Sequence, residues 1–268
     1  MNCGCLARME ERMHLLEFDN LSKFFGGVRA VDGFSYYVPS GNINAIIGPN
    51  GAGKTTIFNL ITGIYQPTHG NIRFQERALI GLKAHQIASL GIARTFQNIR
   101  LFAEFSVLDN VRTACHQRAT YTVLEGLLPT PRRRKQEQAL TDQAYGLLEL
   151  VGLEDRAKEL SKNLPYGHQR RLEIARALAL EPELLLLDEP AAGMNPDETE
   201  KLMEFIQEIK DKFDLTILLI EHHMEVVMGL ADNIAVIDFG KTIAKGTPDE
   251  IQSNPQVIEA YLGVGDEV

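Results

Sequence analysis

Apolar residues follow two different periods along the chain. The continuous runs NAIIG, ELLLLD, LTILLI and NIAVID are bounded by turn residues and predict short buried strands. Helical spacing separates the last three of them, over Pro196–Lys212 and Met224–Leu230. Such alternation of strand and helix predicts a parallel sheet covered by helices, which is an α/β fold.

The pattern changes in the middle of the chain. From about Asn98 to Leu180 strand-like runs vanish, and helical spacing dominates in VLDNVRTACHQ, RKQEQALTDQAYGLLELVG and HQRRLEIARALAL. Just before this region, LKAHQIASLG predicts a helix that Gly91 stops, and IARTFQ predicts a strand. The interruption predicts a helical lobe inserted into the α/β core.

Composition narrows the classes of function. The chain has 268 residues, 44% of them hydrophobic, and a formal net charge of −9. This acidic balance argues against a nucleic-acid partner, whose binding requires neutralisation of phosphates. No apolar run approaches the length that crosses a bilayer, and the start MNCGCLARMEERMH lacks the apolar segment of a signal peptide.

The cysteines and one basic run can each be interpreted in more than one way. The odd count of cysteines, Cys3, Cys5 and Cys115, indicates a reducing compartment, and no His/Cys cluster completes a set of four metal ligands around the first two. The basic run Arg132–Lys135 follows two prolines in GLLPTPRRRKQEQ. It is either a solvated loop that opens a helix or an edge that docks on acidic lipid or a partner.

The stretch GPNGAGKTT follows a buried strand and opens a helix, and it fits G-x-x-x-x-G-K-[ST]. Its glycines let successive backbone N–H groups point inward, and the helix N-terminus adds positive potential where phosphates bind. Lys54 can reach the β- and γ-phosphates, and the hydroxyl of Thr55 can ligate Mg²⁺. The motif therefore predicts a site for a magnesium-bound nucleoside triphosphate.

Carboxylates and histidines follow two further buried strands. LLLLDEP ends a strand at Asp188, at the edge where parallel sheets bind ligands, so this carboxylate can hold Mg²⁺. Glu189 follows directly and can act as the general base for the attacking water. His222 comes just after LTILLI and can stabilise developing charge, although the neighbouring His223 could face the site instead.

Taken in order, these motifs resemble the ATPase subunits of the ATP-binding cassette (ABC) transporter family from about Leu15 to Gly263. The family places a phosphate loop, a Gln at a strand end, a signature, an Asp-Glu pair and a His in sequence. Here they are GPNGAGKTT, Gln97 in ARTFQ, LPYGHQRRLEIARAL, LLLLDEP and LLIEHHM. Neither half of the nucleotide site is complete in one chain, so the resemblance implies a head-to-tail pair of subunits.

The resemblance also implies roles for single residues. Gln97 would touch Mg²⁺ and sense the membrane partner, and Phe25 in KFFGG would stack on adenine. The family reads E-H-D-M after the third strand, which makes His222 the catalytic switch residue and leaves His223 in place of an acid. Lys54 joins Glu189 and His222 in catalysis, and Thr55, Gln97 and Asp188 hold the metal. The other implied nucleotide contacts are Gly48, Asn50, Gly51, Ala52, Gly53, Thr56, Leu164, Pro165, Tyr166, Gly167 and His168.

For the fold, the resemblance implies a P-loop NTPase (RecA-like) core with a mostly parallel sheet, an N-terminal antiparallel β subdomain and an inserted α-helical subdomain. We expect a single ATPase domain over residues 13–268. Its nucleotide-binding core covers 13–97 and 181–268, its helical signature subdomain covers 98–180, and residues 1–12 form an extension without fixed structure. ATP and Mg²⁺ are the expected cofactors.

Within the family, FGGVRAVDG, RTFQNIRLF, LDEPAAGMNP and the tail GTPDEIQSNPQVIEAYLG look like the cassettes of branched-chain amino acid uptake systems. This branch implies permease subunits in the membrane, a second cassette subunit, an indirect link to a substrate-binding protein, and a place at the cytoplasmic face of the inner membrane. Cassettes for lipopolysaccharide export or urea and amide uptake are the alternatives, as is a nucleotide-dependent scaffold with little hydrolysis.

The signature departs from the family's L-S-G-G-Q, because Pro165 stands where the serine would be. Losing one hydrogen bond from that hydroxyl to the γ-phosphate should cost about 1.5–3 kcal/mol. Proline suits the start of a helix, Gly167 still allows close backbone approach, and the helix still aims its N-terminal amides at the same place. We therefore expect a signature that works with a weaker contact to the γ-phosphate.

Overall fold

The structure is a computed structural model that describes residues 14–118 and 130–262. The expected extension over 1–12, with Cys3 and Cys5, lies outside the described residues. The chain divides into two compact units. Unit 1 combines the residues up to Arg94 with those from Glu183 onward, and unit 2 runs from Thr95 to Pro182. Gln97 therefore belongs to unit 2.

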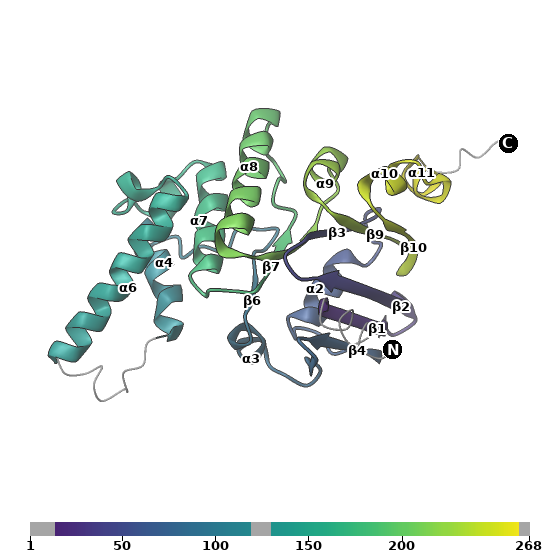
Figure 1. Cartoon of the computed structure of the whole chain (residues 1–268), viewed down its shortest axis with the longest axis horizontal. Helices are drawn as coiled ribbons and strands as arrows, with labels where there is room; N and C mark the ends of the chain where they lie inside the picture. The colour runs from purple at the N-terminus through teal and green to yellow at the C-terminus, as the bar shows by residue number, and fades with distance from the viewer. Residues whose placement is uncertain (1–13, 119–129, 263–268) are drawn as a thin grey trace, which may run out of the picture. The chain divides into compact units, whose positions relative to one another are not determined.

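The central sheet of unit 1 is mostly parallel, as the alternating pattern predicts (Figure 1). Its order is β10-β9-β3-β8-β7-β6, and only the β9·β10 pair is antiparallel. Every residue of β3, β7 and β8 is buried, which explains their unbroken apolar runs. The strands are β3 (Ile43–Ile47), β6 (Ile92–Arg94), β7 (Leu184–Asp188), β8 (Thr216–Ile220), β9 (Asn233–Asp238) and β10 (Lys241–Gly246).

A second, antiparallel sheet of order β2-β1-β4-β5 confirms the expected β subdomain. Its strands are β1 (His14–Phe25), β2 (Val28–Pro39), β4 (His69–Phe74) and β5 (Arg77–Ala78). Helix α2 (Lys54–Ile61) packs between the two sheets (Figure 1). Phe58 of this helix shares one buried cluster with Phe18 of β1 and Leu218 of β8. The helix that follows the phosphate loop is thus fixed by apolar packing on both sides.

The described residues of unit 1 form five more helices, and the sequence patterns predict the first three. Helix α8 begins at Pro196 behind an Asn195–Glu198 capping box and ends at Phe213, where Asp214 takes a left-handed conformation. After Gly240 the chain adds β10, α10 and α11, for which the patterns set no element. The helices are α3 (Ala84–Ser89), α8 (Pro196–Phe213), α9 (Met224–Leu230), α10 (Pro248–Gln252) and α11 (Pro255–Leu262).

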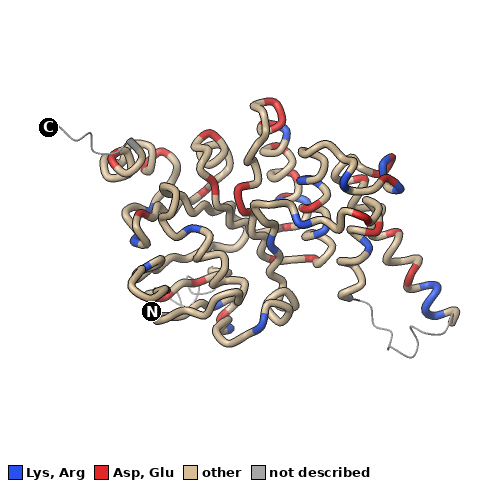
Figure 2. The backbone as a smooth tube through the Cα atoms, turned by 180° about the vertical axis from the view of Figure 1, so that it is seen from behind, with Lys and Arg blue, Asp and Glu red and all other residues tan. Residues whose placement is uncertain are grey.

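Unit 2 is helical over its described residues, with α4 (Val107–Cys115), α6 (Pro131–Leu150) and α7 (Tyr166–Leu178). The basic run Arg132–Lys135 lies in the first turns of α6, behind the cap that Thr130 provides (Figure 2). Among the described residues no helix combines the length and the apolar character that a bilayer crossing requires.

The strand predicted over IARTFQ ends early, at Arg94, and a buried ion pair explains why. Beyond the strand, the backbone N–H of Phe96 donates to Glu173 Oε1 at 3.3 Å instead of joining a strand ladder. Arg170 donates to Glu173 Oε2 at 2.8 Å and to the carbonyls of Phe96 and Gln97 at 2.7 and 2.9 Å. Helix α7 therefore holds the segment that carries Gln97.

Both members of this pair are deeply buried, with side chains 0% and 2% exposed. Burial raises the pKa of Glu173 above its usual range, while the charge of Arg170 and the N–H groups of Arg100 and Phe96 oppose that rise. Each charge depends on the other for its stability, because an unpaired charge in such a place is strongly unfavourable.

We predict that Arg170→Leu lowers the free energy of unfolding by about 3–5 kcal/mol, because it leaves the carboxylate of Glu173 buried without its partner. The double variant Arg170→Leu with Glu173→Leu should lose less than the single one. Urea titrations of both chains measure the difference, with the exposed Arg134→Leu as the control for losing one arginine. A single variant as stable as that control would contradict the prediction.

Candidate nucleotide site

The phosphate loop packs so tightly against neighbouring backbone that two of its positions admit only glycine. Gly48 has a φ of 151°, and a Cβ there would lie 1.9 Å from the carbonyl oxygen of Ile237. Gly53 has a φ of 108°, and its Cβ would lie 2.1 Å from the carbonyl oxygen of Ala30. Both glycines are therefore required by close approach as well as by conformation.

Lys54 lies inside this loop. Its Nζ donates to the carbonyl oxygens of Gly48 and Pro49 at 2.6 and 2.9 Å, and the residue is buried. Burial lowers the pKa of Lys54 from its usual value, while the negative charges of Glu189 and Asp188 raise it. The ammonium is thus positioned at the loop, with a third hydrogen for a phosphate oxygen. The neighbouring Thr55 is exposed, so an ion can reach its hydroxyl from solvent.

Asp188 is the last residue of β7, and its carboxylate is held by Arg94 at the end of β6. Arg94 Nη2 lies 2.7 Å from Asp188 Oδ2, and both side chains are buried. Arg94 Nη1 also donates to Asn59 Oδ1 at 2.8 Å and to Thr62 Oγ1 at 3.2 Å. A metal at Asp188 would therefore share this carboxylate with a guanidinium.

Sequence reasoning missed Arg94. A signal existed, because the residue lies within a predicted strand, three positions before Gln97, and parallel strands bring their carboxyl ends to one edge. The order of the strands, however, could not be read from the sequence. The pairing of β6 with β7 brings this arginine to Asp188.

Glu189 takes a left-handed conformation with a φ of 46°, which costs a residue with a side chain about 1–2 kcal/mol. Its N–H donates to the carbonyl of Ile220 at 2.9 Å, so the adjoining strand β8 holds the strained backbone. The side chain points toward His222, whose Nδ1 lies 3.6 Å from Glu189 Oε2. Strain of this kind is typical of residues that the fold holds in place for a function.

Glu221 directly follows β8 and is a second residue that sequence reasoning missed. It is fully buried, and its Oε1 accepts the N–H of Ala191 at 2.9 Å. Its Oε2 accepts the N–H groups of His222 and His223 at 3.1 and 3.4 Å. One carboxylate therefore orders the two segments that follow β7 and β8. An acid at the end of an apolar strand was the available signal.

Phe25 ends β1 and keeps 42% of its surface exposed. Its ring meets Tyr65 edge to face, with centroids 5.1 Å apart, and Lys23 Nζ lies 5.0 Å from the ring centroid. The side chain is thus fixed by neighbours and still offers an exposed aromatic surface. Such a surface can receive an adenine base, as expected from the family resemblance.

The signature residues open α7 in unit 2. Pro165 is the N-cap, with extended backbone and no side-chain hydrogen bond at the cap, and Leu164 is buried. Tyr166 is 45% exposed, and its hydroxyl accepts from Arg170 at 3.3 Å. Burial lowers the pKa of His168 from its usual value, and the positive charges of Arg156 and Arg171 add to this effect. The negative charge of Glu159 opposes this lowering of the pKa of His168.

The structure places Phe25, Lys54, Thr55, Asp188, Glu189 and His222 in unit 1, and Gln97 with Leu164–His168 in unit 2. Within unit 1 it brings Glu189 and His222 together, and it places Lys54 where both acidic side chains influence its charge. The candidate site in unit 1 therefore contains a phosphate-binding loop, a buried carboxylate and a carboxylate–imidazole pair.

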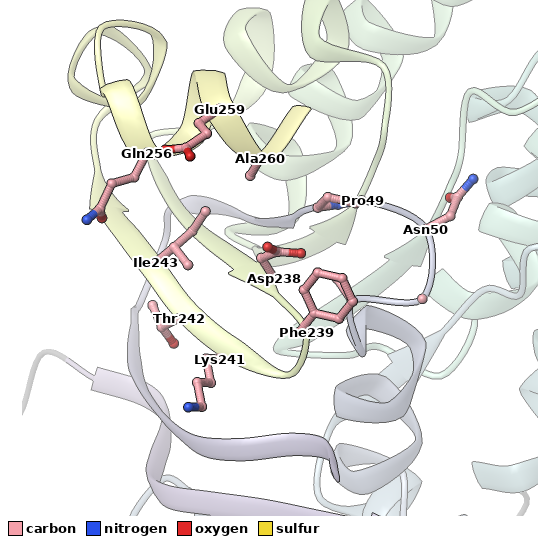
Figure 3. A pocket seen from close by; sticks show the side chains of 12 residues that line it. Pro49, Asn50, Asp238, Phe239, Lys241, Thr242, Ile243, Gln256, Glu259 and Ala260 are labelled. Carbon is pink, nitrogen blue, oxygen red and sulfur yellow. The ribbon is translucent and has the colours of Figure 1, made fainter. Parts of the chain in front are cut away.

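The outer side of the phosphate loop borders a separate groove of about 800 Å³. Its lining joins Pro49–Ala52 to the β9–β10 turn and α11, and Figure 3 shows Asp238, Ile243 and Ala260 around it. Neither Lys54 nor Asp188 lines it, so it is distinct from the phosphate-binding side of the loop. Burial raises the pKa of Tyr261 in α11 to about 12, and the Gly48 backbone opposes that rise.

The chain is similar in sequence to known protein families and to individual known proteins. A family model described as "ABC transporter" matches residues 31–192, and one described as "Branched-chain amino acid ATP-binding cassette transporter" matches residues 241–267. The chain is 49% identical to the high-affinity branched-chain amino acid transport ATP-binding protein LivG of Salmonella typhimurium over 249 residues, which cover 93% of this chain and 98% of that protein. For BraF of Pseudomonas aeruginosa, with a corresponding description, the identity is 46% with the same coverage.

A solved structure agrees with the architecture as well. The ADP conformation of MJ1267, an ATP-binding cassette of an ABC transporter, superposes with a TM-score of 0.81 at 30% identity. The match covers 94% of this chain and 100% of that one.

The strain at Glu189 gives a prediction that does not depend on activity. Glu189→Gly and Glu189→Ala both remove the carboxylate, but only glycine relieves the left-handed backbone, so the glycine variant should be more stable by about 0.5–1 kcal/mol. Urea titrations compare the two variants. At the exposed Glu204 inside α8 the same pair should reverse its order, since glycine is unfavourable within a helix. If the alanine variant is the more stable one at both positions, the backbone of Glu189 is not strained.

Proposed function

Because the chain belongs to the ABC transporter family, and is thus an ATP-binding subunit that hydrolyses ATP, we propose that it powers the uptake of branched-chain, hydrophobic amino acids through separate membrane subunits. The printed descriptions of LivG and BraF support this substrate class, as does the second family model over residues 241–267. In this role Mg²⁺ accompanies ATP, held by Thr55, Gln97 and Asp188.

The observation that carries the proposal is the pairing of Glu189 with His222 next to the phosphate loop. Lys54 would neutralise the β- and γ-phosphates, and Glu189 would accept the proton of the attacking water. His222 would hold Glu189 and the water in place. The left-handed backbone of Glu189 sets the direction of this carboxylate, since the N–H bond to Ile220 fixes it at its base.

The proposed assembly follows from the separation of the two half-sites. Unit 1 carries the phosphate loop, and unit 2, the proposed helical signature subdomain, carries the signature at the start of α7. A second cassette subunit, bound head to tail, would supply its signature to this chain's ATP. The permease subunits would contact the segment around Gln97 at the cytoplasmic face of the membrane, and a substrate-binding protein would deliver the cargo to them.

Arg170 gives this assembly a physical link. It holds the backbone carbonyl of Gln97 from within the signature helix, four residues beyond Tyr166. A displacement of Gln97 by a membrane partner would therefore act directly on the helix that completes the partner's nucleotide site. A nucleotide-dependent scaffold is the alternative, because Pro165 removes the signature hydroxyl.

Hydrolysis separates the two functions. In phosphate-release assays on the purified chain, Glu189→Gln should lower turnover by at least about a hundredfold, since it removes the general base, while ATP binding persists. Lys54→Ala should abolish ATP binding. The control Glu204→Gln makes the same change to an exposed carboxylate on α8 and should leave both turnover and ATP binding unaffected. Equal turnover in the Glu189→Gln and unaltered chains would favour the scaffold.

The signature makes a second prediction. Pro165→Ser restores a hydroxyl for the γ-phosphate, so ATP-dependent pairing of subunits should tighten by about tenfold or more. Sedimentation with ATP in the Glu189→Gln background measures this pairing without turnover. Pro165→Ala is the control, because it removes the proline and adds no donor. If serine and alanine give equal pairing, the absent hydroxyl does not weaken the signature.

A further inference from the structure

Four side chains with metal-binding atoms meet where β7 and β8 end. The ligand atoms of Glu221, His222 and His223 all lie within 4.8 Å of one another. Glu189 adds a fourth, because its Oε2 lies 3.6 Å from His222 Nδ1. Two imidazoles and the carboxylate of Glu221 therefore meet next to Glu189, the proposed general base.

The spacings match those of a small coordination shell. His223 Nδ1 lies 3.3 Å and His222 Nδ1 lies 3.9 Å from Glu221 Oε2. Four ligands placed about 2.0–2.2 Å from one ion in a tetrahedron are about 3.4 Å apart. The distances of 3.3, 3.9 and 3.6 Å along the series His223, Glu221, His222 and Glu189 fall around that value, so one ion can take the place of these three contacts when the side chains move.

The cluster is also held in place as metal ligands usually are. Hydrogen bonds from the N–H groups of Ala191 and His222 fix the Glu221 carboxylate, and Glu221 itself is fully buried at the end of β8. The two imidazoles lie with ring centroids 4.1 Å apart and are 43% and 46% exposed. An ion can therefore reach them from solvent.

We propose that Glu189, Glu221, His222 and His223 form a binding site for a divalent transition-metal ion of the zinc type. Imidazole nitrogen with carboxylate oxygen is a ligand set that suits Zn²⁺, whereas Mg²⁺ takes oxygen ligands in octahedral geometry. This site is separate from the Mg²⁺ ligands Thr55 and Asp188. His223 supplies the second nitrogen, at the position where an acid is expected from the family resemblance.

Binding there regulates hydrolysis, and this part rests on the proposed function. A carboxylate that coordinates Zn²⁺ no longer accepts a proton from water, and an imidazole that coordinates through Nδ1 can no longer carry a proton on that nitrogen. The ion thus holds Glu189 and His222 in an inactive pair. Zn²⁺ acts as an inhibitor that leaves the phosphate loop, and with it ATP binding, intact.

The first experiment tests the site alone. The tag-free chain, without nucleotide or Mg²⁺, is titrated with Zn²⁺ against a chromophoric chelator and with Co²⁺, whose visible spectrum reports tetrahedral ligation. We expect one ion per chain and at least about tenfold weaker binding in His223→Ala, which removes one nitrogen ligand. His85→Ala, which removes an exposed imidazole on α3, is the matched control and should bind as the unaltered chain does.

The second experiment measures phosphate release with excess Mg²⁺ in a zinc-buffered solution, because ATP itself chelates zinc. Zn²⁺ should inhibit the unaltered and His85→Ala chains, whereas His223→Ala should keep its basal turnover and require at least about tenfold more zinc. Equal zinc binding by His223→Ala and the unaltered chain overturns the site, even when hydrolysis is normal. Zinc binding lost with His223 but without inhibition overturns the regulation. A chain that binds zinc as expected but does not hydrolyse ATP refutes the proposed function instead.

Discussion

Contact between backbones at the phosphate loop is the constraint on which the rest of unit 1 depends. The loop lies against the carbonyl of Ile237 from the central sheet and against that of Ala30 from the antiparallel sheet. At these two contacts, positions 48 and 53, there is room only for glycine. The N–H of Gly240 donates to Ala52 at 2.9 Å and adds a third connection. Two sheets thus fix one loop, so its N–H groups are ordered before any phosphate binds, which lowers the entropic cost of binding.

The acidic residues at the ends of β7 and β8 are unfavourable for stability, because two of them bury a charge and one has a strained backbone. Neighbouring groups offset each of these costs. Arg94 offsets the buried charge of Asp188, and backbone N–H groups stabilise the carboxylate of Glu221. Glu189 is held in a strained conformation through its bond to Ile220. The close spacing of Glu189 and His222 serves the proposed hydrolysis. It also brings these two side chains near Glu221 and His223, so the proposed zinc site arises from the same arrangement of strand ends.

In unit 2, too, a buried charged side chain fixes the segments around it. Arg170 is fully buried, and its two Nη groups donate to Glu173, to the hydroxyl of Tyr166 and to the carbonyls of Phe96 and Gln97. A guanidinium suits this task because its planar fork bonds several acceptors in fixed directions. The segment around Gln97 and the first turn of α7 are therefore one structural element, which is what the proposed transmission from a membrane partner to the signature would require.

The sequence by itself determined the elements and the local chemistry. Continuous apolar runs gave β3, β7, β8 and β9, helical spacing gave α8 and α9, and the spacing of Gly48–Thr56 gave the phosphate loop, because these signals reside in neighbouring residues. Only the tertiary structure decided which strand ends lie side by side. The partnership of Arg94 with Asp188, the anchoring by Glu221 and the early end of β6 at Arg94 all join residues far apart in the chain. Strand order and the pairing of buried polar side chains create such contacts, and neither is encoded in a local pattern.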